Sequence, residues 1–262
     1  MITHWIITGD THGQMDRFKW LETEGKPEET AVIILGDAGC NYYKKKKDIF
    51  TKQALEKTGF YFYLVRGNHE DRPENVKGMT SIYDEEVSGE VWFEPDFPHI
   101  KYFKDGGIYN INNHKTLVIG GAYSIDKWYR LQMGYMWFAQ EQLTIEEMTE
   151  IEDKVEGQNF DFVLTHTCPL SWEPVDLFLN GIDQSTVDKS MEVWLDKLKD
   201  NVNWKYYLFG HYHADRVERP YVEQLYQEYE DIESIIARWD KYDKTGELDW
   251  WLPRSPNFYI GE

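Results

Sequence analysis

Cysteine, basic charge and long apolar runs are all scarce in this 262-residue sequence. Its two cysteines cannot build a disulfide framework, so we expect a protein of the reducing cytoplasm. No stretch approaches the roughly 18–20 consecutive apolar residues of a membrane span, and we expect no membrane association. The 28 Lys and Arg side chains are outnumbered by 47 Asp and Glu side chains, for a formal net charge of −19. That balance disfavours a broad surface for nucleic acid or anionic membranes.

Apolar and aromatic side chains, in contrast, are plentiful enough for a folded core. Hydrophobic residues make up 41% of the chain and aromatic residues 16%, which excludes a disordered polymer despite the acidity. The length suits one α/β domain or two small ones, and a chain of this size buries about 70–75% of its unfolded surface. We expect a single domain over residues 1–262, with residues from about 220 to 262 as a C-terminal extension. That extension is predicted to begin with a helix and to end in an aromatic stretch around Trp250 and Trp251.

The first third of the chain alternates strands and helices. Short apolar runs at 6–8, 31–35 and 60–65 are predicted as strands, and the first of them argues against a secretory signal there. Helices are predicted at 14–24 and 48–58, ended by Gly25 and Gly59. This βαβαβ order predicts a parallel sheet with right-handed crossovers, and therefore an α/β fold.

The rest of the chain is predicted to be less regular. Residues 108–111 and 116–119 flank Asn112 and Asn113 and predict a β-hairpin. Proline, glycine and aromatic residues at 82–104 predict irregular structure. Beyond the hairpin we expect an exposed acidic helix at 141–156, a strand at 160–164, a helix begun by Ser185 and a strand at 205–209.

Five of the apolar runs end in side chains that can bind metal or act in catalysis. In open α/β sheets the carboxyl ends of the strands form the ligand crevice, so these residues are predicted to converge although they lie far apart in sequence. Of the eight histidines, only His4, His99 and His114 lie elsewhere, and we assign those three to structure. The five groups are Asp10 with His12, Asp37, Asn68 with His69, His166, and His211 with His213.

The ligand types fit two divalent transition metals. Imidazole and carboxylate together suit Mn, Fe, Zn, Ni or Co rather than Ca or Mg alone. Asp10 and His12 are two residues apart, so they point the same way on an extended segment, and His211 and His213 repeat that spacing. A carboxylate has two oxygens, which makes Asp37 the natural bridge between two cations. Because no cysteine cluster exists, a thiolate zinc site is excluded.

The same five groups carry a resemblance to a known family. In order and spacing they resemble the signature blocks of the calcineurin-like metallophosphoesterase superfamily, and they span residues 9–213. The resemblance implies a four-layer fold, in which a β-sandwich of two sheets is flanked by helices and carries a dinuclear metal site at one edge. The blocks are Gly9-Asp10-Thr11-His12-Gly13, Gly36-Asp37, Gly67-Asn68-His69-Glu70, Thr165-His166 and Gly210-His211-Tyr212-His213.

The resemblance also implies a role for each of these residues. A hydroxide that bridges two metal ions, with manganese favoured, would attack phosphorus in line. His69 would stay outside the coordination sphere and protonate the leaving oxygen, oriented by Glu70 or Asp71. One metal would be held by Asp10, His12 and His213, and the other by Asn68, His166 and His211, with Asp37 as the bridge.

Three further residues are predicted to contact the substrate. Arg66 belongs to a block, 65–70, that is similar to one in protein phosphatases of the superfamily, and the alternative is a structural salt bridge. Asn41 stands where the protein-phosphatase branch has an arginine that binds phosphate, and this difference argues against protein phosphatase activity. Asn41 either binds a phosphoryl oxygen or is a turn residue. Tyr123 lies in a segment, 118–124, that is similar to one in phosphodiesterase-like members.

Together these features predict a metal-dependent phosphoesterase that acts on a small phosphorylated molecule or a nucleotide, with monoesters and diesters both open. The alternatives are a nuclease or RNA phosphodiesterase, which the net charge disfavours, and a non-catalytic metal-binding scaffold. The lysines at 44–47 are either a solvated helix start or an electrostatic lip beside the site. The aromatic residues of 128–138 either pack in the core or stack on a nucleobase.

Overall fold

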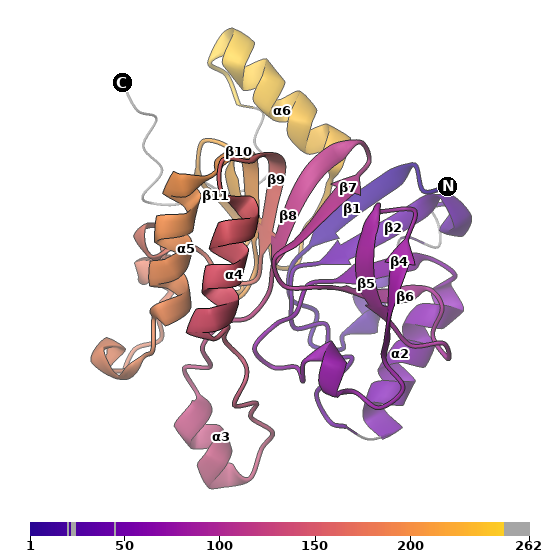
Figure 1. The fold of residues 1–262 in the computed structure, drawn as a ribbon, viewed down its shortest axis with the longest axis vertical. Helices are drawn as coiled ribbons and strands as arrows, with labels where there is room; N and C mark the ends of the chain where they lie inside the picture. Colours follow the sequence, from indigo (N-terminus) through magenta and orange to yellow (C-terminus); the bar gives the residue numbers. More distant parts are fainter. Residues whose placement is uncertain (20, 22–24, 45, 249–262) are drawn as a thin grey trace.

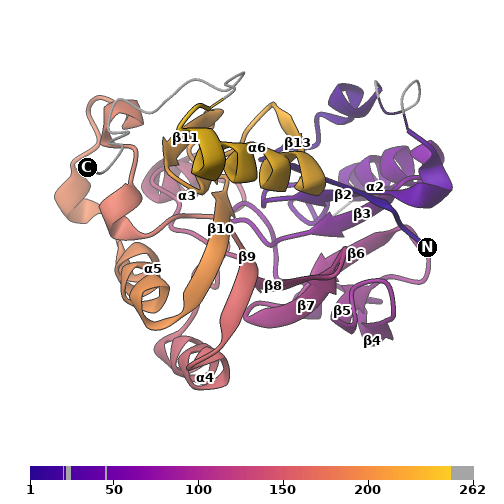
Figure 2. The ribbon, with the colours of Figure 1, turned by 90° about the horizontal axis from the view of Figure 1, so that it is seen from above.

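Two mixed β-sheets face each other at the centre of the structure, with helices on their outer sides (Figure 1, Figure 2). The computed structural model describes residues 1–19, 21, 25–44 and 46–248. The seven-stranded sheet has the order β13 (Tyr229–Asp231), β1 (His4–Thr8), β2 (Thr30–Ile34), β3 (Tyr61–Leu64), β6 (Ile100–Phe103), β5 (Gly89–Phe93) and β4 (Thr80–Asp84). The six-stranded sheet has the order β11 (Arg216–Arg219), β12 (Val222–Gln224), β10 (Asn203–Phe209), β9 (Asn159–Thr165), β8 (His114–Ile119) and β7 (Gly107–Ile111). The helices are α2 (Lys46–Thr58), α3 (Lys127–Met133), α4 (Ile145–Val155), α5 (Ser190–Asn201) and α6 (Ile232–Thr245).

Each sheet is parallel at its centre and antiparallel at its edges. In the first sheet β1, β2, β3 and β6 run parallel, and in the second sheet β8, β9, β10 and β12 do so. Every residue of β2 is buried, as is typical of a parallel strand that is covered on both faces. The parallel sheet predicted for the start of the chain is therefore confirmed.

Three hydrophobic layers hold the sheets and helices together. Between the sheets, Ile33 of the first packs in one cluster with Leu164 of the second. The outer face of the first sheet packs against Leu55 of α2. The outer face of the second sheet, with Val163, packs against α4 and against Leu195 of α5. The order helix, sheet, sheet, helix confirms the predicted α/β class and the four-layer arrangement.

Two local predictions match the structure closely. α2 ends at Thr58, and Gly59 follows with φ of +74°, the left-handed conformation that commonly ends a helix. In the hairpin of β7 and β8, Ile111 pairs with His114, which leaves Asn112 and Asn113 as a two-residue turn. Their φ values of 51° and 66° are those of a hairpin turn whose two central residues are left-handed.

The prediction of irregular structure at 82–104 is wrong. β4 and β5 form an antiparallel hairpin there, and β6 joins that hairpin to β3. Most side chains of the edge strand β4 are exposed, so the strand lacks the apolar alternation that marks a half-buried strand. Val91 of β5 and Phe103 of β6 nevertheless reach the core between the sheets.

Two helix predictions need correction at their N-terminal ends. Within 14–24 the described residues contain a short 3₁₀ turn at Met15–Phe18, and residues 20 and 22–24 lie outside the described part of the chain. α5 begins at Ser190 rather than at Ser185, because Ser185 lies in a separate 3₁₀ turn, Gln184–Thr186, and donates its backbone N–H to Asp183 Oδ1.

The acidic helix predicted at 141–156 is shorter and less exposed than expected. α4 begins at Ile145, and Thr144 and Glu147 form a reciprocal capping box at its start. Its apolar side buries Met148 and Ile151 against the second sheet, while the acidic side chains occupy the opposite side. Residues 141–144 therefore precede the helix as a loop.

The C-terminal segment also differs from its prediction. The helix expected from about residue 220 begins at Ile232, because β11, β12 and β13 occupy most of 216–231. β11 and β12 extend the second sheet and β13 extends the first, so this segment contributes to both sheets. The aromatic stretch around Trp250 and Trp251 lies outside the described residues. Within the described part of the chain, no helix is both long and apolar enough to cross a membrane.

A buried cluster of ion pairs ties α6 to both sheets. Arg238 Nη2 donates to Glu230 Oε2 of β13 at 2.5 Å, and Arg238 Nη1 lies 3.4 Å from Glu223 Oε1 of β12. Trp239 Nε1 also donates to Glu223 Oε1, at 2.8 Å. Burial raises the pKa of both carboxyl groups, against the opposing effect of the guanidinium. One arginine on α6 thus joins strands that belong to different sheets.

We predict that Arg238→Met lowers the free energy of unfolding by about 3–5 kcal/mol, because it leaves two buried carboxyl groups without their cation. Urea unfolding followed by far-UV circular dichroism at neutral pH measures this loss. Lys244→Met, which removes an exposed charge from the same helix, serves as the control and should change stability by less than about 0.5 kcal/mol. Equal, small losses in both variants would show that the cluster does not hold the sheets together.

Candidate metal centre

The predicted ligands meet at the carboxyl ends of strands from both sheets. Asp10, Asp37 and Asn68 follow β1, β2 and β3, whereas His166 and His211 follow β9 and β10. Their arrangement places the ligand-bearing loops of both sheets at one site, as the strand-end pattern predicts. Two sets of possible ligand atoms lie within 4.8 Å of one another: Asp10, His12 and His213, and Asp10, Asp37 and His166. Asp10 belongs to both sets and joins them.

In each of the two buried carboxylates, Asp10 and Asp37, one oxygen accepts a backbone N–H and the other is left for a ligand at the site. Asp10 Oδ1 accepts the backbone N–H of His211 at 2.9 Å, and Asp37 Oδ1 accepts that of His69 at 2.8 Å. Asp10 Oδ2 is buried and has no hydrogen-bond donor among the described residues. Burial alone would raise the pKa of Asp10, but His166 and the other neighbouring histidines lower it, so the carboxylate is charged. A buried anionic oxygen without a donor fits a bound cation.

The imidazoles of His12 and His213 complete the first set of ligands. Their Nε2 atoms lie 2.9 Å apart, and they are 3.9 and 3.4 Å from Asp10 Oδ2. Three potential ligand atoms from two distant segments of the chain therefore surround one point. Imidazole and carboxylate are ligands that first-row transition metals prefer.

A chain of hydrogen bonds fixes the orientation of Asn68. Glu141 Oε2 can only accept a hydrogen bond, so the Ser124 hydroxyl 2.6 Å away donates to it. The Ser124 oxygen in turn accepts from Asn68 Nδ2 at 2.8 Å. Asn68 Oδ1 is thereby turned away from Ser124 and toward His166 Nε2, which lies 2.9 Å from it.

The tautomer of His166 is fixed in the same way. His166 Nδ1 lies 2.7 Å from the backbone carbonyl of Leu35, which can only accept, so Nδ1 carries the proton. In the neutral ring Nε2 then has a lone pair that faces Asn68 Oδ1. Two acceptors held 2.9 Å apart in a buried place repel each other unless a cation lies between them. This donor set, like Asp10 Oδ2, fits a metal ion.

The loops reach this geometry through unusual backbone conformations. A side chain at Gly36, whose φ is +103°, would place its Cβ 2.0 Å from His166 Nδ1. A Cβ at Gly67 would lie 2.0 Å from Asp37 Oδ1. Residues other than glycine rarely adopt positive φ, and such strain is concentrated at functional sites. Four predicted ligands nevertheless have it: His12 (47°), Asp37 (49°), His211 (67°) and His213 (54°).

His211 lies at the margin of the cluster. Its ring centroid is 4.9 Å from that of His166, but its nitrogens belong to neither of the two close sets of ligand atoms. Burial, together with the nearby His166, lowers the pKa of His211 to about 3, so its imidazole is neutral. A neutral imidazole is the form that binds a metal ion.

A cavity of about 480 Å³ opens over the cluster and includes His69. Its lining contains His12, Asp37, His213 and His69, together with an arginine, Arg130, that the sequence patterns did not single out. Arg130 Nη2 lies 3.2 Å from His69 Nε2. Burial and Arg130 lower the pKa of His69, whereas Asp37 raises it, and the net effect is a lower value.

The predicted orientation of His69 by Glu70 or Asp71 is wrong. Glu70 Oε1 accepts the backbone N–H groups of Gly39, at 2.9 Å, and Cys40, at 3.4 Å, so it anchors the loop that follows β2. Asp71 Oδ2 pairs with Lys44 Nζ at 2.7 Å. His69 is therefore oriented by Arg130, a residue 61 positions away in the sequence.

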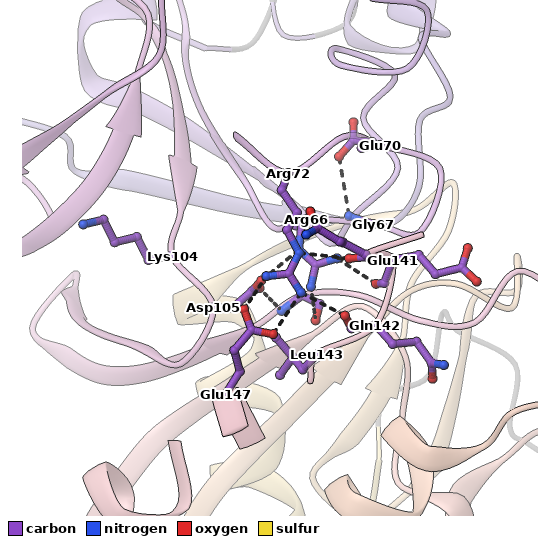
Figure 3. A network of polar contacts seen from close by, with 12 residues as sticks. Arg66, Gly67, Glu70, Arg72, Lys104, Asp105, Glu141, Gln142, Leu143 and Glu147 are labelled. Carbon is purple, nitrogen blue, oxygen red and sulfur yellow. Dashed lines mark hydrogen bonds and ion pairs between the residues drawn. The ribbon is translucent and has the colours of Figure 1, made fainter. Parts of the chain in front are cut away.

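The structure corrects the prediction that Arg66 holds a phosphoryl oxygen. Its guanidinium is buried and donates to Asp105 Oδ2 at 2.8 Å, to the carbonyl of Glu141 at 2.7 Å and to that of Gly120 at 3.3 Å (Figure 3). These acceptors lie away from the cavity that contains His69. Arg66 instead holds the loop that carries Glu141, and therefore supports the hydrogen bonds that orient Asn68.

Asn41 and Tyr123 also lie outside the cavity over the cluster. Asn41 is buried and lines a separate cavity of about 1110 Å³ between α2 and the 3₁₀ turn at Pro73–Asn75. Its backbone carbonyl accepts the N–H of Asp71 at 3.0 Å. Tyr123 is 8% exposed and does not line the cavity over the cluster either. The substrate contacts expected of these two residues stay predictions.

The fold and this cluster of carboxylates and imidazoles define a metal-dependent phosphoester hydrolase. Residues 4–215 match the family model for calcineurin-like phosphoesterases, and the chain belongs to that family. Among solved structures, it is similar to phosphopantetheinyl hydrolase (PptH) from Mycobacterium tuberculosis, with 12% identity over 98% of each chain and a TM-score of 0.44. No curated protein matches the sequence significantly.

We predict that the protein retains two Mn²⁺ ions per chain after loading and gel filtration, measured by inductively coupled plasma mass spectrometry. Asp10→Ala should lower the content to one ion or fewer, because its carboxylate belongs to both sets of ligand atoms, and Asp37→Ala should lower both occupancies because it is the expected bridge. Asp153→Ala, in the exposed face of α4, is the control and should keep the full content. Retention of both ions by Asp10→Ala would show that the metals bind elsewhere.

Proposed function

We propose that this phosphoesterase uses two divalent transition-metal ions, with manganese favoured, to hydrolyse a small phosphorylated molecule or a nucleotide. The observation that carries the proposal is the pair of close ligand sets that share Asp10, whose buried Oδ2 has no hydrogen bond among the described residues. The expected ligands are Asp10, His12 and His213 for one ion, and Asn68, His166 and His211 for the other. Asp37 is the expected bridge between them.

The proposed chemistry divides between the metals and the side chains. When bound, the metals supply acidified water as nucleophile and offset the negative charge of the phosphoryl oxygens. The chain contributes fixed ligand orientations, through the Leu35 carbonyl at His166 and through Ser124 and Glu141 at Asn68. Because these partners are buried, the ligand geometry is set before substrate arrives.

His69 is proposed to act on the leaving group. It borders the cavity and follows the ligand Asn68 directly, yet its ring nitrogens belong to neither close set of ligand atoms. Arg130 is a donor only, so in the neutral ring His69 Nε2 accepts from it and Nδ1 carries the proton. An imidazole so placed is suited to donate a hydrogen bond from Nδ1 to the departing oxygen, and so to stabilise the negative charge that develops there.

The size and charge of the site favour small substrates. The cavity of about 480 Å³ has room for a small phosphoester, whereas a net charge of −19 opposes a long polyanion. Lys47 lines the cavity, in keeping with an electrostatic lip, while Lys44 is paired with Asp71. The described cysteines, Cys40 and Cys168, are buried free thiols, in keeping with a proposed location in the cytoplasm.

Hydrolysis of aryl phosphate monoesters and diesters tests this proposal. We expect turnover with Mn²⁺, its loss with a chelator, and higher activity on small phosphoesters than on long duplex DNA at equal phosphate concentration. Raising salt should favour the duplex relative to the small substrate, because screening shortens the repulsive field to about 10 Å at 0.1 M. Robust duplex cleavage that falls steeply with salt would support the nuclease alternative, and absence of any turnover would support the scaffold alternative.

We predict that His69→Asn lowers kcat by roughly 10²–10⁴-fold while both metal ions are retained, since the residue serves the leaving group and not the metals. The loss should shrink for aryl phosphates with acidic phenols, because little negative charge has to be stabilised on their leaving oxygen. Steady-state kinetics over a series of phenols, combined with metal analysis, measures both effects. His99→Asn, at a histidine paired with Glu56 on the outer side of the first sheet, is the matched control. Loss of metal from His69→Asn would refute this role.

A further inference from the structure

Arg130 places a guanidinium in the cavity over the metal ligands. It comes from α3, a short helix that lies apart from the two sheets, at the end of a loop that follows β8 (Figure 1). The cavity lining joins Arg130 with His12, His69 and His213, and only 14% of its side chain is exposed. Arg130 is therefore part of the wall that faces any substrate bound at the ligands.

The guanidinium is held rigidly by three partners. Its Nε donates to Asp126 Oδ1 at 2.7 Å, Nη1 donates to the hydroxyl of Tyr42 at 2.8 Å, and Nη2 lies 3.2 Å from His69 Nε2. A guanidinium has five N–H groups, and a contact of 3.4 Å from Nη1 to the carbonyl of Met136 uses a fourth. One N–H of Nη2 is left without an acceptor among the described residues.

The other cations near the ligands are less suited to this task. Arg66 is turned away into its contacts with Asp105 and backbone carbonyls. Lys47 also lines the cavity, but its ammonium bonds to the Tyr43 hydroxyl at 2.5 Å and lies 4.0 Å from the centre of that ring. Asn41, at the place of the arginine in the protein-phosphatase branch, lines a different cavity. If an arginine contacts the substrate in this cavity, it must therefore come from a part of the chain other than the second block.

We propose that Arg130 binds the phosphoryl group of the substrate, and so supplies from α3 the phosphate-binding arginine that the second block lacks. The inference rests on the proposed function. A planar guanidinium matches the spacing of phosphate oxygens and forms short, charge-assisted hydrogen bonds with them. Because Asp126 and Tyr42 already hold the group, little side-chain freedom is lost when phosphate binds.

This assignment also accounts for the position of α3, which lies outside the hydrophobic core. No residue of α3 is buried, and the apolar residues Trp128, Tyr129 and Leu131 are exposed by 67%, 55% and 47%. The helix therefore adds little to the hydrophobic core. Of the aromatic residues of 128–138, Phe138 is buried as predicted, whereas Trp128 and Tyr129 do not pack in the core. The polar contacts of Arg130 with Tyr42 and His69 are what connect α3 to the wall of the cavity.

Binding of inorganic phosphate to the Mn²⁺-loaded full chain, measured by isothermal titration calorimetry, tests the proposal without turnover. Arg130→Met should weaken phosphate binding roughly 10- to 100-fold, the usual effect of losing a charge-assisted hydrogen bond, and should raise KM for an aryl phosphate. Arg130→Lys keeps the charge but loses the planar guanidinium. Its phosphate affinity should lie between those of wild type and Arg130→Met. The Mn²⁺ content should be unchanged in all variants.

Lys127→Met is the matched control, because it removes the same charge from the same helix at a side chain that packs over Trp137 and does not line the cavity. It should leave phosphate affinity within about twofold of wild type. Phosphate binding as tight in Arg130→Met and Arg130→Lys as in wild type, with only kcat reduced, would overturn the proposal and leave Arg130 as a positioning residue for His69. Phosphate binding that depends on Arg130 in a chain that hydrolyses no phosphoester would instead support this inference and refute the proposed function.

Discussion

The structure depends on one electrostatic constraint, which is the convergence of buried acceptors with no donor between them. Asp10 Oδ2 has no hydrogen bond among the described residues, and Asn68 Oδ1 lies 2.9 Å from His166 Nε2, which carries a lone pair when that ring is neutral. Acceptor atoms placed this close repel one another, so other parts of the fold must hold their side chains in position. It does so with hydrogen bonds that leave each side chain one orientation, from the Leu35 carbonyl to His166 and from Glu141 through Ser124 to Asn68.

The same constraint explains where the backbone is strained and where it is stable. The loops that carry His12, Asp37 and His213 adopt positive φ, which costs about 1–3 kcal/mol for each such residue and persists only where the surroundings impose it. The surroundings here are the parallel centres of both sheets, whose apolar side chains fill the layer between them. The well-packed pair of sheets therefore supports the strained loops at its edge. Residues such as Arg66 do not contact the ligands but hold these loops in position.

The sequence was sufficient to predict those parts of the molecule whose signals are local. Apolar runs followed by Asp, Asn or His identified strands of both sheets and the residues that follow them, and Gly59 and Asn112-Asn113 marked a helix end and a turn. Arg130 and Glu141 could not be found in this way, because their roles arise from contacts with His69 and Ser124 that only the tertiary fold creates. The edge strand β4 was missed because its exposed side chains leave no periodic pattern. Arg66 was misassigned since a motif records the residue and not the direction of its guanidinium.

The origin of the ligands on two different sheets has a thermodynamic consequence. Asp10 and Asp37 come from the first sheet and His166 and His213 from the second, so a metal ion bound by both sets spans the interface between the sheets. Binding to the assembled form alone stabilises that form by RT ln(1 + [L]/Kd), about 2.7 kcal/mol at a hundredfold excess over Kd. A substitution that loosens the packing between the sheets weakens the apparent metal affinity only as far as it lowers the fraction of the chain in the assembled form. A metal ion at this position would therefore protect the chain most in heat or denaturant, where the two sheets begin to separate.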